Sequence, residues 1–199
     1  MDNYTKLDKI LHRQLLGDNN LSKFLYKRLI KKSKNFKFSN SSKHVFITGL
    51  ARSGTTALLN KIFSTGEFGS FLYKYMPFIL SPSLANIYSK NSNKYKELYL
   101  ERHHKDGILF SSNSPECLDE PFWIKSSEKN YKSNKLSPYL PRQRDLKTYA
   151  YLLNRYAEIQ NINKLVIKNN NNHIRIKSLS KFFSKSKFII LFRDPLTHS

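Results

Sequence analysis

The chain has 199 residues, of which 39% are hydrophobic and 14% aromatic, a composition that is typical of a globular domain and excludes an intrinsically disordered chain. The formal net charge is +21, and lysine supplies most of it. Nucleic-acid binding is compatible with such a charge, but we favour solvated lysine-rich faces that attract anionic substrates, and we expect no nucleic-acid partner.

The sequence carries no recognisable signal for export or membrane insertion. Residues 1–11 lack a basic region followed by an apolar core, and no run reaches the roughly 18 apolar residues that a transmembrane helix needs. The single cysteine, Cys117, excludes an internal disulfide and fits a reducing compartment. We therefore expect a cytoplasmic protein.

Residues 1–43 are predicted to form a helical, basic extension. Apolar residues recur at helical spacing in two short stretches within residues 5–32, with a break at 17–20. A basic amphipathic helix can lie on an anionic membrane surface, but we favour packing on the domain with the lysines outward. Residues 33–43 are polar and basic and predict a linker.

Residues 44–66 predict a strand, a loop and a helix in succession. The stretch 44–48 is rich in β-branched and aromatic residues, and apolar residues then return at helical spacing up to a stop at Gly66. Gly49 and Gly54 are separated by four residues, as in the P-loop, where glycines let backbone amides approach a phosphate. The sequence therefore predicts an anion-binding loop at a helix N-terminus.

The loop departs from the P-loop of nucleotide hydrolases at one position. Thr55 stands where those enzymes carry the lysine that contacts the β- and γ-phosphates. The cation lies inside the loop instead, at Arg52, whose guanidinium can hold an anionic group through two parallel hydrogen bonds. This pattern disfavours an ordinary NTPase.

The remaining elements alternate between strand and helix. In chain order, the patterns predict a strand over 68–73, a helix over 86–101, a turn-rich segment over 111–120, a helix over 146–159, a strand over 164–167, a helix over 174–183 and a strand over 187–192. Such alternation predicts an α/β fold: a three-layer parallel sheet with P-loop NTPase-like topology and helices on both faces. We assign residues 44–199 to this domain. Because the chain stops at Ser199, just after a strand, we expect its C-terminal part to be missing.

The phosphate loop resembles that of a known enzyme superfamily. Residues 47–56, Ile-Thr-Gly-Leu-Ala-Arg-Ser-Gly-Thr-Thr, are similar to the 5′-phosphosulfate loop of the PAPS-dependent sulfotransferases, whose members often read P-R-S-G-T-T. Ala51 replaces the usual proline. The resemblance implies that the co-substrate PAPS is bound through its 5′-phosphosulfate by Gly49, Arg52, Ser53, Gly54, Thr55 and Thr56. It also implies that Arg52 neutralises charge on the bridging oxygen.

Two further strand ends resemble the same superfamily. The run Lys187–Pro195 is similar to the strand and loop that bind the 3′-phosphate, which implies that Arg193 contacts this group. Ser199 is the candidate for the family serine, two positions short of its usual spacing. Ile167-Lys168-Asn169-Asn170 resembles a strand end that commonly reads L-K-x-P, so that Lys168 would stabilise transition-state charge. A solvated lysine and a strand-capping arginine remain the alternatives.

Transfer of a sulfuryl group to a hydroxyl or amine needs a base for the acceptor proton. Residues 101–108 and 114–123 resemble a segment of a bacterial sulfotransferase subgroup, E-R-x-H-x-D-G-I followed by S-P-E-A-x-E-E-x-F-W. That resemblance implies that His104 and Asp106 face the acceptor, with His104 as the first candidate for the base. Glu67 is the second, and His103 and Glu116 stay open.

No zinc-ligand spacing is present, and the enzymes that the chain resembles need no metal. The leading hypothesis is transfer of a sulfuryl group from PAPS to a carbohydrate, lipid or small-molecule acceptor. A divergent P-loop kinase, with Asp194 as metal ligand, is the second hypothesis. The third is an inactive, truncated sulfotransferase that acts as a basic anion-binding module. The sequence predicts neither the acceptor nor the oligomeric state.

Overall fold

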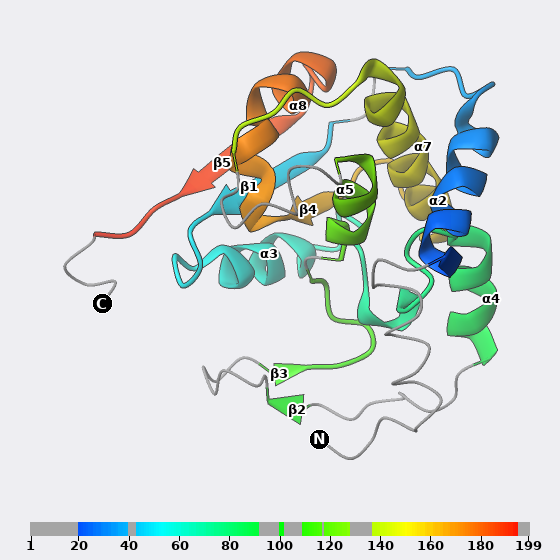
Figure 1. The fold of residues 1–199 in the computed structure, drawn as a ribbon. Coiled ribbons are helices and arrows are strands. Elements are labelled where there is room, and N and C mark those ends of the chain that lie inside the picture. Colours follow the sequence, from blue (N-terminus) through cyan, green and yellow to red (C-terminus); the bar gives the residue numbers. More distant parts are fainter. Residues whose placement is uncertain are drawn as a thin grey trace.

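The computed structural model describes residues 20–39, 43–91, 100–101, 109–116, 118–127 and 137–194 (Figure 1). The first of the two helices predicted within residues 5–32 lies outside these ranges. The second is α2, Asn20–Ser33.

A parallel three-stranded sheet forms the centre of the molecule. Strands β1 (Val45–Gly49), β4 (Val166–Lys168) and β5 (Lys187–Leu191) lie in the order β4-β1-β5. Both neighbours run parallel to β1, with Val45 opposite Val166 on one side and opposite Lys187 on the other. The predicted parallel sheet is therefore confirmed, and the strand before the phosphate loop is its middle strand.

Helices cover both faces of this sheet, as predicted. On β1, Val45 and Ile47 pack with Leu59 of α3 (Thr55–Phe63), whereas Phe46 belongs to the larger cluster on the opposite face. This alternation follows from the two-residue period of a strand. The larger cluster is covered by α2, α7 (Gln143–Ile159) and α8 (Ile176–Phe182). Helix α3, the sheet and these three helices therefore form three layers.

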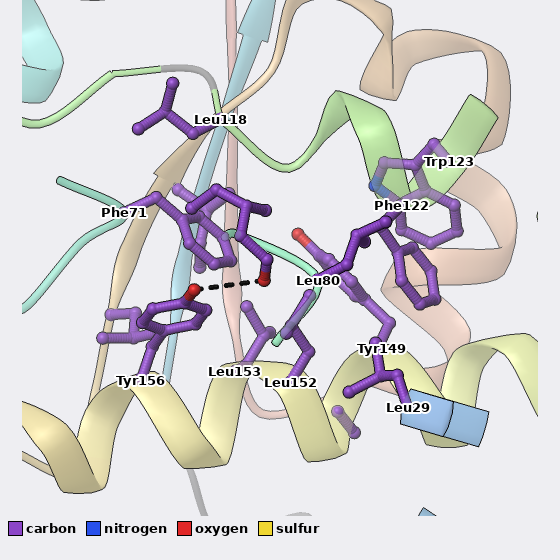
Figure 2. Packing of buried hydrophobic residues seen from close by; sticks show 14 of the residues in the cluster. Leu29, Phe71, Leu80, Leu118, Phe122, Trp123, Tyr149, Leu152, Leu153 and Tyr156 are labelled. Carbon is purple, nitrogen blue, oxygen red and sulfur yellow. Dashed lines mark hydrogen bonds between the residues drawn. The ribbon is translucent and has the colours of Figure 1, made fainter. Parts of the chain in front are cut away.

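Aromatic and leucine side chains make up most of the larger core (Figure 2). Tyr149 and Tyr156 of α7 are fully buried, and the Tyr156 hydroxyl donates to the Ile79 carbonyl at 3.1 Å. Helix α2 packs on α7 through Leu25 and Leu29, with most of its lysines exposed, which agrees with the packing expected for a basic amphipathic helix. The described part of the predicted extension thus shares this core, and the boundary at residue 43 stays a prediction.

The predicted strand over 68–73 is wrong. This segment lies beside β4, but it pairs only through isolated bridges from Gly69 to Leu165 and from Leu72 to Pro115. The chain then turns into a short 3-10 helix, Tyr73–Tyr75, so that the alternating apolar pattern serves packing without a continuous ladder.

Helices α4, α7 and α8 differ from their predicted bounds, and one helix was not predicted. Helix α7 begins at Gln143 rather than at residue 146. Helix α4 runs over Pro82–Asn91, where Pro82 fits the first helical position, while Leu100–Glu101 at the end of the predicted helix is strand β2, paired with β3 (Leu109–Phe110). The predicted helix over 174–183 is α8, preceded by a 3-10 turn over Asn170–Arg175. Helix α5, Glu120–Ser126, follows the turn-rich segment.

Candidate functional site

The phosphate loop joins the carboxyl end of β1 to the N-terminus of α3, as its sequence predicts. Arg52 and Gly54 both adopt positive φ, 67° and 88°, while the intervening Ser53 does not. Backbone of alternating handedness makes successive amides converge on a concave, anion-binding surface. The local chain therefore has the form of an anion cradle.

The first backbone amides of α3 are not capped by a side chain. Gly54 is the N-cap residue. Within the part of the chain that the structure describes, the amides of Gly54, Thr55 and Thr56 have no hydrogen-bond acceptor, as expected for a first helical turn. Together with the positive end of the helix dipole, these donors fit the phosphate or sulfate end of a nucleotide.

The first glycine of the loop is required by a neighbouring strand. Gly49 has φ 153°, and a Cβ at this position would lie 2.2 Å from the Leu191 carbonyl oxygen of β5 and 3.0 Å from Ser53 Oγ. Leu191 is the register partner of Gly49. Gly49 therefore permits the close approach of β1 and β5, in addition to any approach to an anion.

The body of the loop is a tight turn. The Ser53 hydroxyl donates to the Leu50 carbonyl at 2.7 Å, and the Ser53 amide donates to the same oxygen at 3.3 Å. Leu50 and Arg52 are exposed, whereas Thr55 and Thr56 are buried. The loop thus presents its guanidinium-bearing residue at the surface and keeps the threonines of the helix start inside.

Arg193 leaves the sheet at the same edge as the phosphate loop. Strand β5 ends at Leu191, opposite Gly49, and Arg193 follows two residues later as an exposed residue. The carboxyl edge of a parallel sheet is where α/β proteins bind their ligands. The structure therefore brings Arg193 and the loop to one edge, whereas Ser199 lies outside the described residues.

Lys168 is not a solvated lysine. It is 7% exposed and ends β4 opposite Ile47, two residues before Gly49. From strand rise and spacing, its Cα lies about 8 Å from that of Gly49. Lys168 Nζ is 2.9 Å from Glu116 Oε1, and both side chains are largely buried. The sequence left Glu116 open as a base, and the structure pairs it with Lys168.

The candidates for the base are divided by the structure. His103, His104 and Asp106 lie outside the described residues, so their role stays a prediction. Glu67 follows the end of α3, at the edge of the sheet opposite the phosphate loop. Its exposed carboxylate accepts a hydrogen bond from Lys164 Nζ at 2.8 Å. That bond holds the pKa of Glu67 below its usual value. The structure therefore does not bring Glu67 to the phosphate loop.

Sequence reasoning missed an asparagine turn, residues 169–172, which follows β4 at the same edge. Asn169 and Asn172 are buried, and most of the side-chain amide groups of the run are hydrogen-bonded. Its carboxylate partners, Asp119 and Glu120, are about fifty positions earlier in the chain. Four consecutive amide side chains directly after a predicted strand were the available signal.

In the described ranges, no group of three or more histidine, cysteine, aspartate or glutamate side chains is arranged to hold a metal ion. A search of the described helices finds none with the length and apolarity needed to cross a membrane.

Comparison with known proteins gives one match. A family model with the description "Sulfotransferase family" matches residues 44–199, which include the phosphate loop, Lys168 and Arg193. Neither the curated proteins nor the solved structures contain a match to the chain.

Proposed function

Because the chain belongs to the sulfotransferase family, we propose that it transfers a sulfuryl group from PAPS, 3′-phosphoadenosine 5′-phosphosulfate, to a hydroxyl or amine of a carbohydrate, lipid or small-molecule acceptor. The observation that carries this proposal is the cradle of amides at residues 54–56, placed at the carboxyl edge of the parallel sheet. Transfer of this kind breaks the bond between sulfur and the bridging phosphate oxygen and forms a new bond from sulfur to the acceptor. The acceptor proton passes to a base, for which His104 is the first candidate.

Each of the proposed donor contacts has a distinct physical task. The amides of Gly54, Thr55 and Thr56 hold the phosphosulfate oxygens without a change of protonation, and Arg52 adds a fixed positive charge. Arg193 is proposed to hold the 3′-phosphate, and this is supported by its place two residues after β5, whose end pairs with Gly49 of the loop. Two separated anionic groups, each with its own cation, favour a 3′,5′-bisphosphate skeleton over a simple triphosphate.

Lys168 is proposed to stabilise the charge that develops on the bridging oxygen. It projects from the sheet on the side of α3, because its register partner Ile47 packs against that helix. Glu116 fixes the position of its ammonium group through the 2.9 Å contact. A preoriented charge at a largely buried site acts more strongly than one in bulk water, because the surrounding protein screens it less.

The alternative of a divergent kinase is less well supported. Thr55 is buried at the start of α3 and supplies no cation to a γ-phosphate. The candidate metal ligand of that hypothesis, Asp194, is an exposed residue directly beside Arg193. A neighbouring guanidinium reduces the attraction of a carboxylate for Mg²⁺.

Isothermal titration distinguishes these two functions. We expect the protein to bind PAP, the product nucleotide of PAPS, and to bind ATP with magnesium much more weakly. Arg52→Ala should weaken PAP binding by roughly tenfold or more, the range for a charge-assisted hydrogen bond. Binding of ATP with magnesium, combined with no heat from PAP, would overturn the proposal.

Lys168 provides a test of the chemical step. In assays with radiolabelled PAPS, Lys168→Met should lower the transfer or slow hydrolysis of the sulfuryl group by about a hundredfold, as for loss of one preorganised electrostatic contact. Lys147→Met is the matched control, because Lys147 is exposed on α7, away from the sheet edge. Equal turnover in the two variants would exclude Lys168 from the reaction, and PAP binding without turnover would favour an anion-binding module.

A further inference from the structure

One residue of the asparagine turn contacts both ends of the phosphate loop. The Thr48 hydroxyl donates to the backbone carbonyl of Asn170 at 2.9 Å, and the Thr55 hydroxyl donates to its side-chain Oδ1 at 3.3 Å. Thr48 lies in the strand that enters the loop, and Thr55 is the first residue of the helix that leaves it. Asn170 therefore bridges the two chain segments between which the loop is suspended.

The turn that carries Asn170 is itself held on both sides. The Asn169 amide donates to the Ile47 carbonyl of β1 at 2.9 Å, and Asn169 Oδ1 accepts from the Asn171 amide at 2.9 Å. The Asn169 side chain also donates to Asp119 at 2.9 Å, and Asn171 Nδ2 donates to Glu120 at 2.8 Å. The backbone of Asn170 is thus fixed by hydrogen bonds before and after it.

The carboxylates of Asp119 and Glu120 belong to a buried polar network that holds them in fixed positions. Arg175, 1% exposed, lies 3.1 Å from Glu120 and 4.4 Å from the Trp123 ring, over which its guanidinium stacks. Asp119 is fully buried and accepts hydrogen bonds from Trp123 Nε1 and from the Tyr149 hydroxyl. Burial raises the pKa of Asp119, and the donors around it oppose that effect. Several hydrogen bonds and an ion pair thus hold Asp119 and Glu120 in place, and buried polar networks of this kind are rigid where their groups are paired.

We propose that Asn170 is a positioning residue: it holds the strand-to-helix junction of the phosphate loop in place, and thereby sets the affinity of the loop amides for the anionic end of the nucleotide. The inference rests on the proposed function. The amide of Thr55 is one of the donors that have no acceptor in the described part of the chain, so a shift of Thr55 displaces the cradle directly. Asn170 stands where the resembling L-K-x-P sequence has proline, whose side chain offers no acceptor to Thr55.

Thr48→Val gives the cleanest test, because the Thr48 hydroxyl is buried, donates to Asn170 and is not among the residues proposed to touch the nucleotide. Ser70→Ala is the matched control: the Ser70 hydroxyl is also buried and donates to the Val166 carbonyl of β4 at 2.8 Å, on the strand edge away from the loop. We expect Thr48→Val and Asn170→Ala to raise the dissociation constant for PAP roughly fivefold, the effect of one lost hydrogen bond. Ser70→Ala should change it less than about twofold while lowering the melting temperature similarly.

If all three variants lose stability and bind PAP as the wild type does, the turn is merely structural and the proposal is overturned. Asn170→Asp adds a second readout, because it keeps the acceptor for Thr55 but adds a negative charge beside the cradle. Its PAP affinity should be reduced at low salt and recover towards that of the wild type as salt rises, whereas the loss in Asn170→Ala should persist. An equal salt response of the two variants would contradict the positioning role.

Failure of the proposed function would show differently, as a lack of PAP binding by the wild-type chain. Hydrogen exchange of the ligand-free protein then tests the positioning role alone. The Leu58 amide, which donates to the Gly54 carbonyl at 3.0 Å, should exchange faster in Thr48→Val and Asn170→Ala than in Ser70→Ala. Unchanged exchange over residues 54–60 in these variants would overturn the inference without reference to any nucleotide.

Discussion

Alanine substitutions at three glycines separate backbone strain, steric contact and ligand binding in this protein. Gly49, Gly54 and Gly66 all have positive φ, at 153°, 88° and 74°. A Cβ at Gly54 or Gly66 would meet no atom within 4 Å, whereas at Gly49 it would lie 2.2 Å from the Leu191 carbonyl oxygen. Gly66 lies three residues after the end of α3, beyond the helix terminus that is remote from the phosphate loop, and serves as the control for Gly54.

The expected losses of stability follow from this geometry. Gly54→Ala and Gly66→Ala carry only the cost of a left-handed alanine, about 1 kcal/mol in the free energy of unfolding. That loss corresponds to a decrease in melting temperature of about 2–4 °C for a chain of this size. Gly49→Ala adds an overlap that only separation of β1 from β5 can relieve, so we expect a loss of about 3–5 kcal/mol.

Differential scanning calorimetry and titration with PAP test both parts of this reasoning. Gly54→Ala and Gly66→Ala should melt at similar temperatures, but only Gly54→Ala should weaken PAP binding, because its Cβ lies at the N-cap of α3 beside the open amides. Equal PAP affinity in these two variants would refute the role of the loop backbone. A Gly49→Ala protein as stable as Gly66→Ala would refute the close approach of β1 and β5.

Two further predictions concern buried ionisable side chains. Burial lowers the pKa of His44 to about 4, and its Nδ1 accepts a hydrogen bond from the Leu165 amide at 3.1 Å, so the unfolded chain binds the extra proton between pH 6.5 and 4. The contribution of His44 to the free energy of unfolding should therefore be fully present above pH 6.5 and be lost as the pH falls through this window. Urea unfolding should show a loss of about 2 kcal/mol between pH 7.5 and 5. A free energy of unfolding that does not change would contradict a buried, neutral imidazole. Arg175→Lys should lower the free energy of unfolding by about 2–4 kcal/mol, because an ammonium group cannot contact both Glu120 and Asn172 as the guanidinium does. An unfolding midpoint equal to that of the wild type would show that simultaneous contact of the Arg175 guanidinium with Glu120 and Asn172 is not needed for stability.

Elements whose signals are local were predicted well from the sequence. The strand, loop and helix over residues 44–66 follow from β-branched residues, from glycines at positions of positive φ and from a 3.6-residue apolar period, all within about twenty residues. Helix α7 has the same kind of signal, with Leu146, Leu153 and Tyr156 on its buried face. The helix begins at Gln143, three residues before its predicted start.

Features that depend on distant partners were not predicted. The apolar run at 68–73 has the pattern of a strand, but its pairing is decided by where Leu165 and Pro115 lie, and only two bridges form. The asparagine turn depends on Asp119 and Glu120, which no local pattern connects to it. The burial of Lys168 likewise follows from its pairing with Glu116 across a separation of 52 residues.

The cation arrangement of the site has a physical logic that the loop motif alone does not show. A P-loop with lysine carries its cation at the helix start, where Thr55 is buried here and bonded to Asn170. In the proposed site, positive charge is instead supplied by Arg52 from the exposed loop and by Lys168 from the neighbouring strand. Because no lysine occupies the helix start, Thr55 can be bonded to the asparagine turn. The largely buried ammonium group of Lys168 on β4 is paired with the Glu116 carboxylate. Thr55 and Asn170 therefore depend on one another, so introducing a lysine by Thr55→Lys should break the junction rather than create a nucleotide hydrolase.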